Sequence, residues 1–144
     1  MSVELHRLQR RILANPRMEQ QQRLRVAESY IFPKGLFQSS TWPALADKDF
    51  RKPHHAVVNV YRSILGDKAQ ACRGGMSDDD VVHELHAFAP AVMLKTARLL
   101  LLIRVVEKAS IRMIALLLAS RTSSSSWIAS VEKDLAWLTT GTIF

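Results

Sequence analysis

Residues 53–66 read PHHAVVNVYRSILG, and this stretch decides the fold class. Its apolar side chains recur every three or four residues, which is the spacing of one face of an α-helix. Pro53 suits the first position of a helix, where no backbone N–H is needed, and Gly66 suits the end. The stretch therefore predicts a helix over residues 54–65 with one buried stripe: Val57, Val60, Tyr61, Ile64 and Leu65.

The chain before this helix shows the same helical spacing. A basic helix over residues 3–14 should end before Pro16, because the residue that precedes a proline disfavours the α conformation. A second helix from about Arg17 should be kinked or ended by Pro33 and Gly35. Its predicted core residues are Leu24, Ala27 and Ile31.

The chain after Gly66 predicts three further helices. Ser77 can cap one, with Asp80 completing a capping box and Val81, Val82, Leu85 and Phe88 forming its apolar face. Pro90 should start a long helix over about residues 91–107, with a continuation to Ser120 left open. This helix is apolar around most of its circumference, which predicts a buried, central position. A last helix over residues 127–138 would present Trp127, Val131, Leu135 and Leu138.

These elements predict an all-α fold, a bundle of five to six helices with short loops. The length of 144 residues fits a single helical domain. We expect this domain to comprise an N-terminal basic helix at 3–14, a core bundle at 17–120 and a C-terminal helix at 127–138.

The composition favours polyanionic partners. The chain has 20 Lys and Arg against 13 Asp and Glu, a formal net charge of +7. Such an excess favours binding to nucleic acid or to an anionic membrane surface. No transmembrane span is expected, because charged residues interrupt the apolar run 89–120 before it reaches about 18 uncharged residues.

The cysteine count and the N-terminus bear on localisation. Cys72 is the single cysteine, so no intrachain disulfide and no cysteine-based zinc motif can form. A secretory signal is not expected, since arginines replace its apolar core. We therefore expect an intracellular location, nucleus or cytoplasm, rather than secretion. The Arg-rich start also has features of a mitochondrial presequence, although Glu4 and Glu19 count against targeting. The arginines concerned are Arg7, Arg10 and Arg11.

Several residues invite a catalytic or metal-site interpretation that their spacing does not support. The trio Asp78, Asp79 and Asp80 resembles a magnesium site, but Ser77 before it and the helical stripe after it favour helix capping. His83 and His86 are three apart, not the four of a zinc-protease helix. A zinc site from Cys72, His83 and His86 is loosely spaced, and His54 and His55 would point to different faces. The serines at 123–126 lack a nucleophile elbow. We expect no catalytic residue, no metal and no cofactor.

The basic residues give the stronger signal. Arg104, Lys108 and Arg112 stand four apart, so on one continuous helix they would form a stripe about 12 Å long. Lys95 and Arg98 lie toward the same polar side. Such stripes can follow a phosphate backbone, although a solvated helix face is the simpler explanation. The N-terminal arginines would supply a second basic surface: Arg7, Arg10, Arg11 and Arg17, with Arg23 and Arg25 beyond them.

The order of three motifs resembles a known family. Residues 30–42, YIFPKGLFQSSTW, resemble the stretch just after the polymerase palm of non-LTR (LINE-type) retroelement reverse transcriptases. There an apolar helix reaches a proline, then a Leu-aromatic-small pattern, then a small-x-Trp turn. Residues 61–66, YRSILG, resemble the helix end that follows in the family. The capped start at Ser77 and the basic apolar helix from Pro90 then come in the family's order, so the resemblance covers about residues 18–107.

The departures limit what this resemblance implies. Pro53 interrupts a helix that the family keeps regular, Gln38-Ser39 replaces an aromatic-Gly pair, and the family's Trp, Gly-His and later Cys/His cluster are missing. The palm of such proteins lies upstream, so the catalytic aspartates of their RNA-directed DNA polymerase are not in this chain. The resemblance implies thumb-side helices that pack against an RNA or RNA–DNA duplex without catalysis.

Two functions from different classes therefore remain. The first is a non-catalytic, thumb-like fragment of a retroelement reverse transcriptase that grips nucleic-acid backbone through basic helices. The second is a small basic helical subunit of a larger protein or ribonucleoprotein assembly. It would dock through the apolar helix 89–120 together with Trp127 and Trp137.

Overall fold

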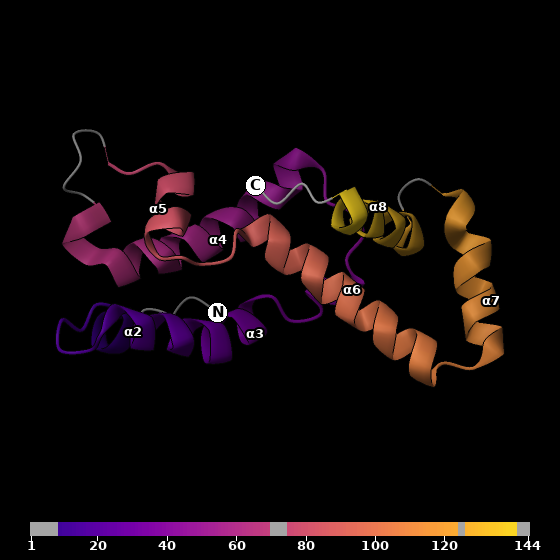
Figure 1. Cartoon of the computed structure of the whole chain (residues 1–144), viewed down its shortest axis with the longest axis horizontal. Coiled ribbons are helices and arrows are strands. Elements are labelled where there is room, and N and C mark those ends of the chain that lie inside the picture. The colour runs from indigo at the N-terminus through magenta and orange to yellow at the C-terminus, as the bar shows by residue number, and fades with distance from the viewer. Residues whose placement is uncertain (1–8, 70–74, 124–125, 141–144) are drawn as a thin grey trace. The chain divides into compact units, whose positions relative to one another are not determined.

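The computed structural model describes residues 9–69, 75–123 and 126–140, and within them it contains seven α-helices and no strand (Figure 1). The all-α prediction is confirmed. Shorter π and 3-10 turns join or extend the helices. The α-helices are α2 (Gln20–Val26), α3 (Phe32–Gly35), α4 (Asp47–Leu65), α5 (Asp78–Glu84), α6 (Pro90–Lys108), α7 (Ile111–Ala119) and α8 (Trp127–Thr140).

The described residues group into two compact units. One contains residues 9–37 and 49–90, and the other contains 38–48 and the described residues from 91 onward. The boundaries fall near the start of α4 and at the start of α6. The single domain over residues 1–144 stays a prediction.

In the first unit, α2 and α3 are joined by a π turn over Ala27–Ile31. The wider turn lies immediately before Pro33, which removes one backbone donor and would crowd the carbonyl four residues earlier in a regular helix. Leu24, Ala27 and Ile31 are buried, as predicted. The helix starts at Gln20 rather than at Arg17, because Asn15 holds a turn there and accepts a hydrogen bond from the Arg17 backbone N–H at 3.0 Å.

Only the end of the predicted helix 3–14 falls within the described residues. There Gln9–Leu13 form a π turn, and Leu13 is fully buried. The rest of that prediction concerns residues 1–8, which lie outside the described part of the chain.

Helix α4 carries the core of the first unit. It begins at Asp47 and contains Pro53, so the prediction that Pro53 occupies the first helical position is wrong. The exposed turns before Pro53 stay helical despite the backbone hydrogen bond that proline removes. The predicted stripe is confirmed, since all five of its residues are buried. The helix ends before Gly66, whose φ of 59° is a left-handed conformation that glycine adopts readily.

Tyr61 is the central side chain of this core. Its ring is fully buried and stands edge-on to Phe32, with the ring centroids 5.5 Å apart. Its hydroxyl donates a hydrogen bond to the Phe88 carbonyl at 3.0 Å. Burial, and secondarily the charge of Glu28, raises the pKa of Tyr61 well above its ordinary value. The residue therefore acts as a neutral donor in the core.

Helix α5 begins with the predicted capping box. The Ser77 hydroxyl accepts a hydrogen bond from the Asp80 backbone N–H at 3.1 Å, and the Asp80 carboxylate accepts one from the Ser77 backbone N–H at 3.3 Å. On the predicted apolar face, Val81 and Leu85 are buried and Val82 is half-buried, whereas Phe88 lies beyond the helix and is exposed.

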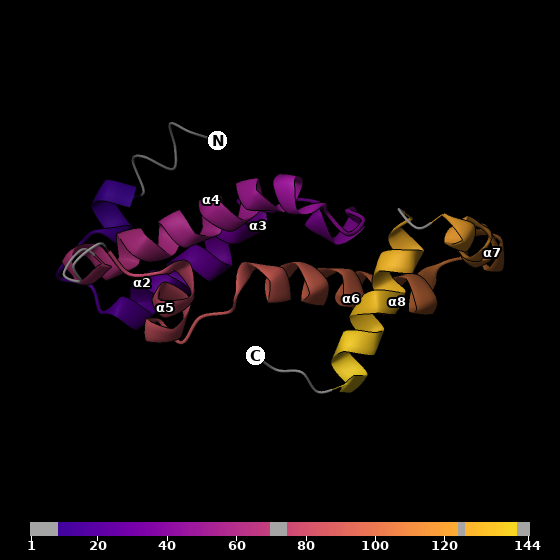
Figure 2. The same ribbon diagram turned by 90° about the horizontal axis from the view of Figure 1, so that it is seen from above.

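The second unit is built around the contact of α6 with α8, which cross in Figure 2. Two hydrogen bonds join residues 38–48 to α8. The Trp127 indole Nε1 donates to the Ser40 carbonyl at 2.6 Å, and the Ala44 backbone N–H donates to the Ser130 hydroxyl at 2.7 Å. The buried face of α8 differs from the predicted one, because Leu135 and Leu138 are exposed. The residues buried there are Ile128, Ser130, Val131 and Asp134.

The predicted helix over about residues 91–107 is confirmed as α6. The continuation to Ser120, which the sequence left open, does not form, and the predicted buried, central position is wrong. Helix α6 stops at Lys108, because the Ser110 hydroxyl caps a separate helix, α7, by accepting a hydrogen bond from the Met113 backbone N–H. Moreover, after Pro90 at its first position, Leu94 is the one apolar side chain buried within α6, and α7 buries none. None of the helices in the described ranges is both long enough and apolar enough to cross a membrane.

Candidate nucleic-acid interface

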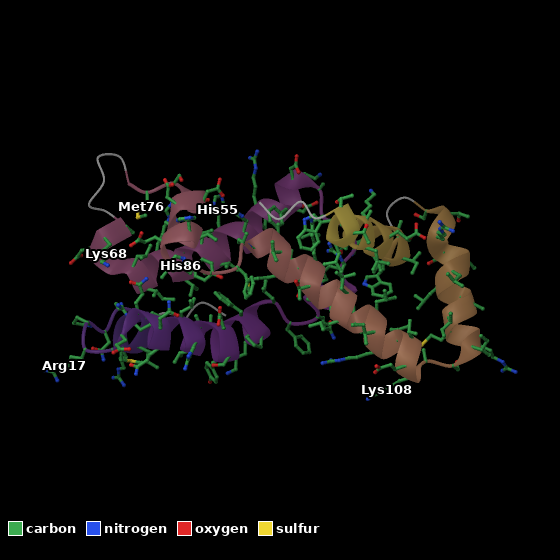
Figure 3. The ribbon with its side chains drawn as sticks, viewed as in Figure 1. Arg17, His55, Lys68, Met76, His86 and Lys108 are labelled. Atoms are coloured by element: carbon green, nitrogen blue, oxygen red, sulfur yellow. The ribbon has the colours of Figure 1, made fainter. Side chains whose placement is uncertain are left out.

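The N-terminal basic surface is described in part. Arg7 and the side chain of Arg10 lie outside the described residues. Arg11, Arg17 and Arg25 are exposed, and Figure 3 shows Arg17 directed away from the ribbon just before α2. The described part of the N-terminal basic surface therefore presents three arginines to solvent.

Arg23 has a different role from its neighbours. Its guanidinium donates a hydrogen bond through Nη1 to the Leu13 carbonyl at 2.9 Å, and its Nε is buried without a hydrogen-bond partner among the described residues. The side chain ties α2 to the preceding π turn. It is thus a structural arginine, whereas its neighbour Arg25 is exposed.

Two of the predicted contact residues on α6 are engaged by side chains of α8. Lys95 places its Nζ over the Trp137 ring, 4.4 Å from the centroid. Arg98 is 6% exposed and forms two hydrogen bonds with Asp134, which is itself buried. Arg98 is therefore withdrawn from the predicted nucleic-acid-binding set, because its guanidinium does not reach the surface and its charge is already paired.

The outer end of α6 retains two exposed cations. Arg104 and Lys108 are one helical turn apart, about 6 Å along the axis. Within the described residues, no carboxylate pairs with either side chain. Lys108 projects from the end of the helix in Figure 3. These two residues can meet adjacent phosphates without first breaking an internal ion pair.

Arg112 does not extend this row. It is exposed on α7, beyond the break at Ala109 and Ser110, so the predicted continuous stripe of about 12 Å does not form. Figure 1 shows α7 leaving the end of α6 in a different direction. Its neighbours Ile111, Met113 and Leu116 on α7 are exposed and apolar.

An ion-pair cluster that the sequence interpretation missed lies in the first unit. Asp78 accepts a hydrogen bond from Arg62 Nη2 at 2.7 Å and contacts His54 Nε2 at 3.0 Å. Arg62 also donates to the Met76 carbonyl at 2.8 Å. The hydrogen bond from Arg62, and then that from His54, hold the pKa of Asp78 below its ordinary value despite partial burial. The cluster links α4 to the start of α5 and leaves Arg62 engaged rather than available.

The metal-site alternatives gain no support within the described residues. No group of three or more His, Cys, Asp or Glu is placed to hold a metal ion there. His83 and His86 are exposed with ring centroids 6.2 Å apart, and Cys72, the third residue of that set, lies outside the described part of the chain. Asp80 caps α5 and Asp78 is bound by Arg62, which gives two of the three aspartates structural roles.

The chain matches no protein-family model, no curated protein and no solved structure.

Proposed function

We propose that this chain is a non-catalytic, thumb-like fragment of a retroelement reverse transcriptase that binds the nucleic-acid backbone. The observation that carries the proposal is the pair of exposed cations Arg104 and Lys108 at the end of α6, which no carboxylate in the described residues neutralises. The exposed Arg11 and Arg17 of the first unit add to it. The motif order of residues 18–107 supports the choice of family.

The chemistry of these residues fits contact with phosphates rather than with bases. Arg and Lys on a helix surface neutralise phosphates and release condensed counterions, which strengthens binding without reading the sequence. A thumb needs that kind of contact, because it must hold any template–primer duplex. The net charge of +7 adds a general attraction toward the duplex.

The test is equilibrium binding of the full chain to a fluorescent RNA–DNA hybrid duplex at increasing salt. The proposal predicts binding that weakens linearly in log–log form between about 50 and 200 mM salt, with little dependence on base sequence. Comparison with a duplex of the same length and different sequence is the control. Undetectable binding at the lowest salt, or strong sequence preference, contradicts the proposal.

A second candidate function, docking into a larger protein assembly, is favoured by the exposed apolar side chains of α6 and α7. Leu100, Ile103 and Val106 lie exposed on α6, and α7 adds Ile111, Met113, Leu116 and Leu118. Large apolar side chains that are exposed together on a small protein commonly mark an interaction site. Apolar dye binding to the folded chain tests this function: serine substitutions at Ile111, Leu116 and Leu118 should weaken it, and an unchanged signal would contradict it.

A further inference from the structure

Helix α7 has an unusual distribution of side chains. Ile114 and Leu117 are half-buried on one side, and every other residue of the helix is exposed. Ile111 is 78% exposed and Leu116 is 73% exposed, so the largest apolar groups face away from the unit. Helix α7 therefore packs against the rest of the unit only through the narrow face that carries Ile114 and Leu117.

Arg112 lies near the centre of the exposed face. Since each residue turns the helix by about 100°, Ile111 and Leu118 fall on one side of Arg112, and Met113 and Leu116 fall on the other. The arginine is thus flanked by apolar side chains on both sides rather than set at a polar edge. Helix α7 contains no acidic residue that could pair with it.

The position of Arg112 distinguishes among three partners that could cover the exposed face of α7: a membrane, a second copy of the chain and another protein. On an anionic membrane, the centre of the inserted face would be its most deeply buried part, where a charged group is disfavoured. In a symmetric contact between two α7 helices, Arg112 would meet a second apolar, acid-free face carrying the same positive charge. A groove in another protein, lined by apolar side chains and containing one carboxylate, fits both the apolar side chains of α7 and the charge of Arg112.

We propose that α7 is a recognition helix that inserts into an apolar groove of a partner protein and pairs Arg112 with a carboxylate in that groove. Leu116 and Ile111 are the apolar anchors. Arg112 fixes the position of α7 along the groove through bidentate hydrogen bonds to an Asp or Glu. The inference rests on the docking function above and names its chemistry. It assigns Arg112 to protein recognition rather than to phosphate contact.

The experiment uses a phage-displayed library of apolar helical-hairpin peptides, randomised along one groove and selected against the full chain. The proposal predicts that the recovered binders carry an Asp or Glu in the middle of an apolar groove. Arg112→Glu should weaken them at least about tenfold, and changing the acidic residue of the peptide to Lys should restore binding to that variant. Lys133→Glu, an exposed substitution on α8, is the matched control and should have little effect.

The outcomes separate the inference from the docking function. Binders that are lost with Leu116→Ser but unaffected by Arg112→Glu would support docking and overturn the role of Arg112. Binders unaffected by both, or no binders, would overturn docking as well. Self-association that Arg112→Glu leaves unchanged, or adsorption to phosphatidylserine vesicles that Leu116→Ser abolishes, would assign the face to a second copy or to a membrane.

Discussion

Arg98 and Asp134 form a buried, two-point ion pair between α6 and α8. Arg98 Nε lies 2.6 Å from one carboxylate oxygen of Asp134, and Nη2 lies 3.0 Å from the other. Both side chains are less than a tenth exposed. The pair fixes which turn of α6 meets which turn of α8, because its planar geometry tolerates little sliding.

Removing one partner of this pair should strongly destabilise the second unit. Asp134→Ala leaves a buried guanidinium without its counter-charge, and we expect a loss of about 3–5 kcal/mol in the free energy of unfolding. Urea denaturation of the full chain measures it. Replacing both residues, Arg98→Met with Asp134→Leu, should recover most of the loss.

The exposed pair Arg121–Glu132 is the matched control. Its Nε–Oε1 distance is also 2.6 Å, but both side chains are exposed, Arg121 by 64% and Glu132 by 43%. Glu132→Ala should therefore cost about 1 kcal/mol or less. Equal losses for Asp134→Ala and Glu132→Ala would show that burial does not govern the strength of these pairs.

The stability of the first unit should depend on acid pH through Asp78. Its folded-state pKa lies below the ordinary value, mainly because Arg62 donates a hydrogen bond to the ionised carboxylate. The stabilisation is therefore complete above the ordinary carboxyl pKa of about 4 and is lost as the pH falls through the lowered pKa. Asp78→Asn should flatten the decline in urea midpoint below about pH 4. Asp79→Asn, a change to the exposed neighbour, should preserve that decline; if both variants behave alike, the pairing with Arg62 is not its cause.

The N-cap of α5 should make a local contribution. Ser77→Ala removes the acceptor for the Asp80 backbone N–H, and we expect a cost of about 1 kcal/mol in unfolding free energy. Ser77→Asp should retain most of the stability, since aspartate also caps helices. Hydrogen exchange of the α5 backbone amides is the measurement. Unchanged exchange in Ser77→Ala would contradict the role of the capping box.

The loss of stability on replacing an apolar residue of the second unit should depend on whether that residue is buried or exposed. Leu94→Ala removes a buried side chain of α6 and should cost about 2–5 kcal/mol, whereas Leu116→Ser on α7 should change stability by about 0.5 kcal/mol or less. Urea denaturation compares the two. A large loss in Leu116→Ser would mean that α7 packs within the chain, which would remove the basis for docking.

Local patterns in the sequence were sufficient to predict the elements whose signals are local. The stripe of α4, the stop at Gly66, the start of α6 at Pro90 and the Ser77 box are confirmed. Each depends on residues within about two turns of one another, so the sequence contains the whole cause.

The remaining features depend on distant residues or on competing local preferences. The apolar content of residues 91–120 predicts burial, but it does not indicate which surface would cover them. The N-cap at Ser110 divides the segment into two helices. Arg98 and Asp134 are 36 residues apart. Their signal was a charged residue within an apolar stripe on each helix, which favours a buried pair over a surface contact. Pro53 shows that a helix can extend N-terminally past a proline.

We propose above that exposed cations bind the nucleic-acid backbone. The most direct test of this is the salt dependence of binding in two charge-matched variants. The first changes Arg11, Arg17, Arg104 and Lys108 to Gln, and the second changes four other exposed cations, Arg51, Lys52, Lys68 and Lys133, to Gln. Both lose the same net charge.

Binding to the RNA–DNA hybrid as a function of salt is measured for both variants and the parent chain. The account predicts that the first variant lowers the slope of log affinity against log salt by up to about 0.9 per residue removed, while the second keeps nearly the parent slope. Equal slopes for the two variants would mean that net charge alone attracts the duplex, and would contradict the proposed interface.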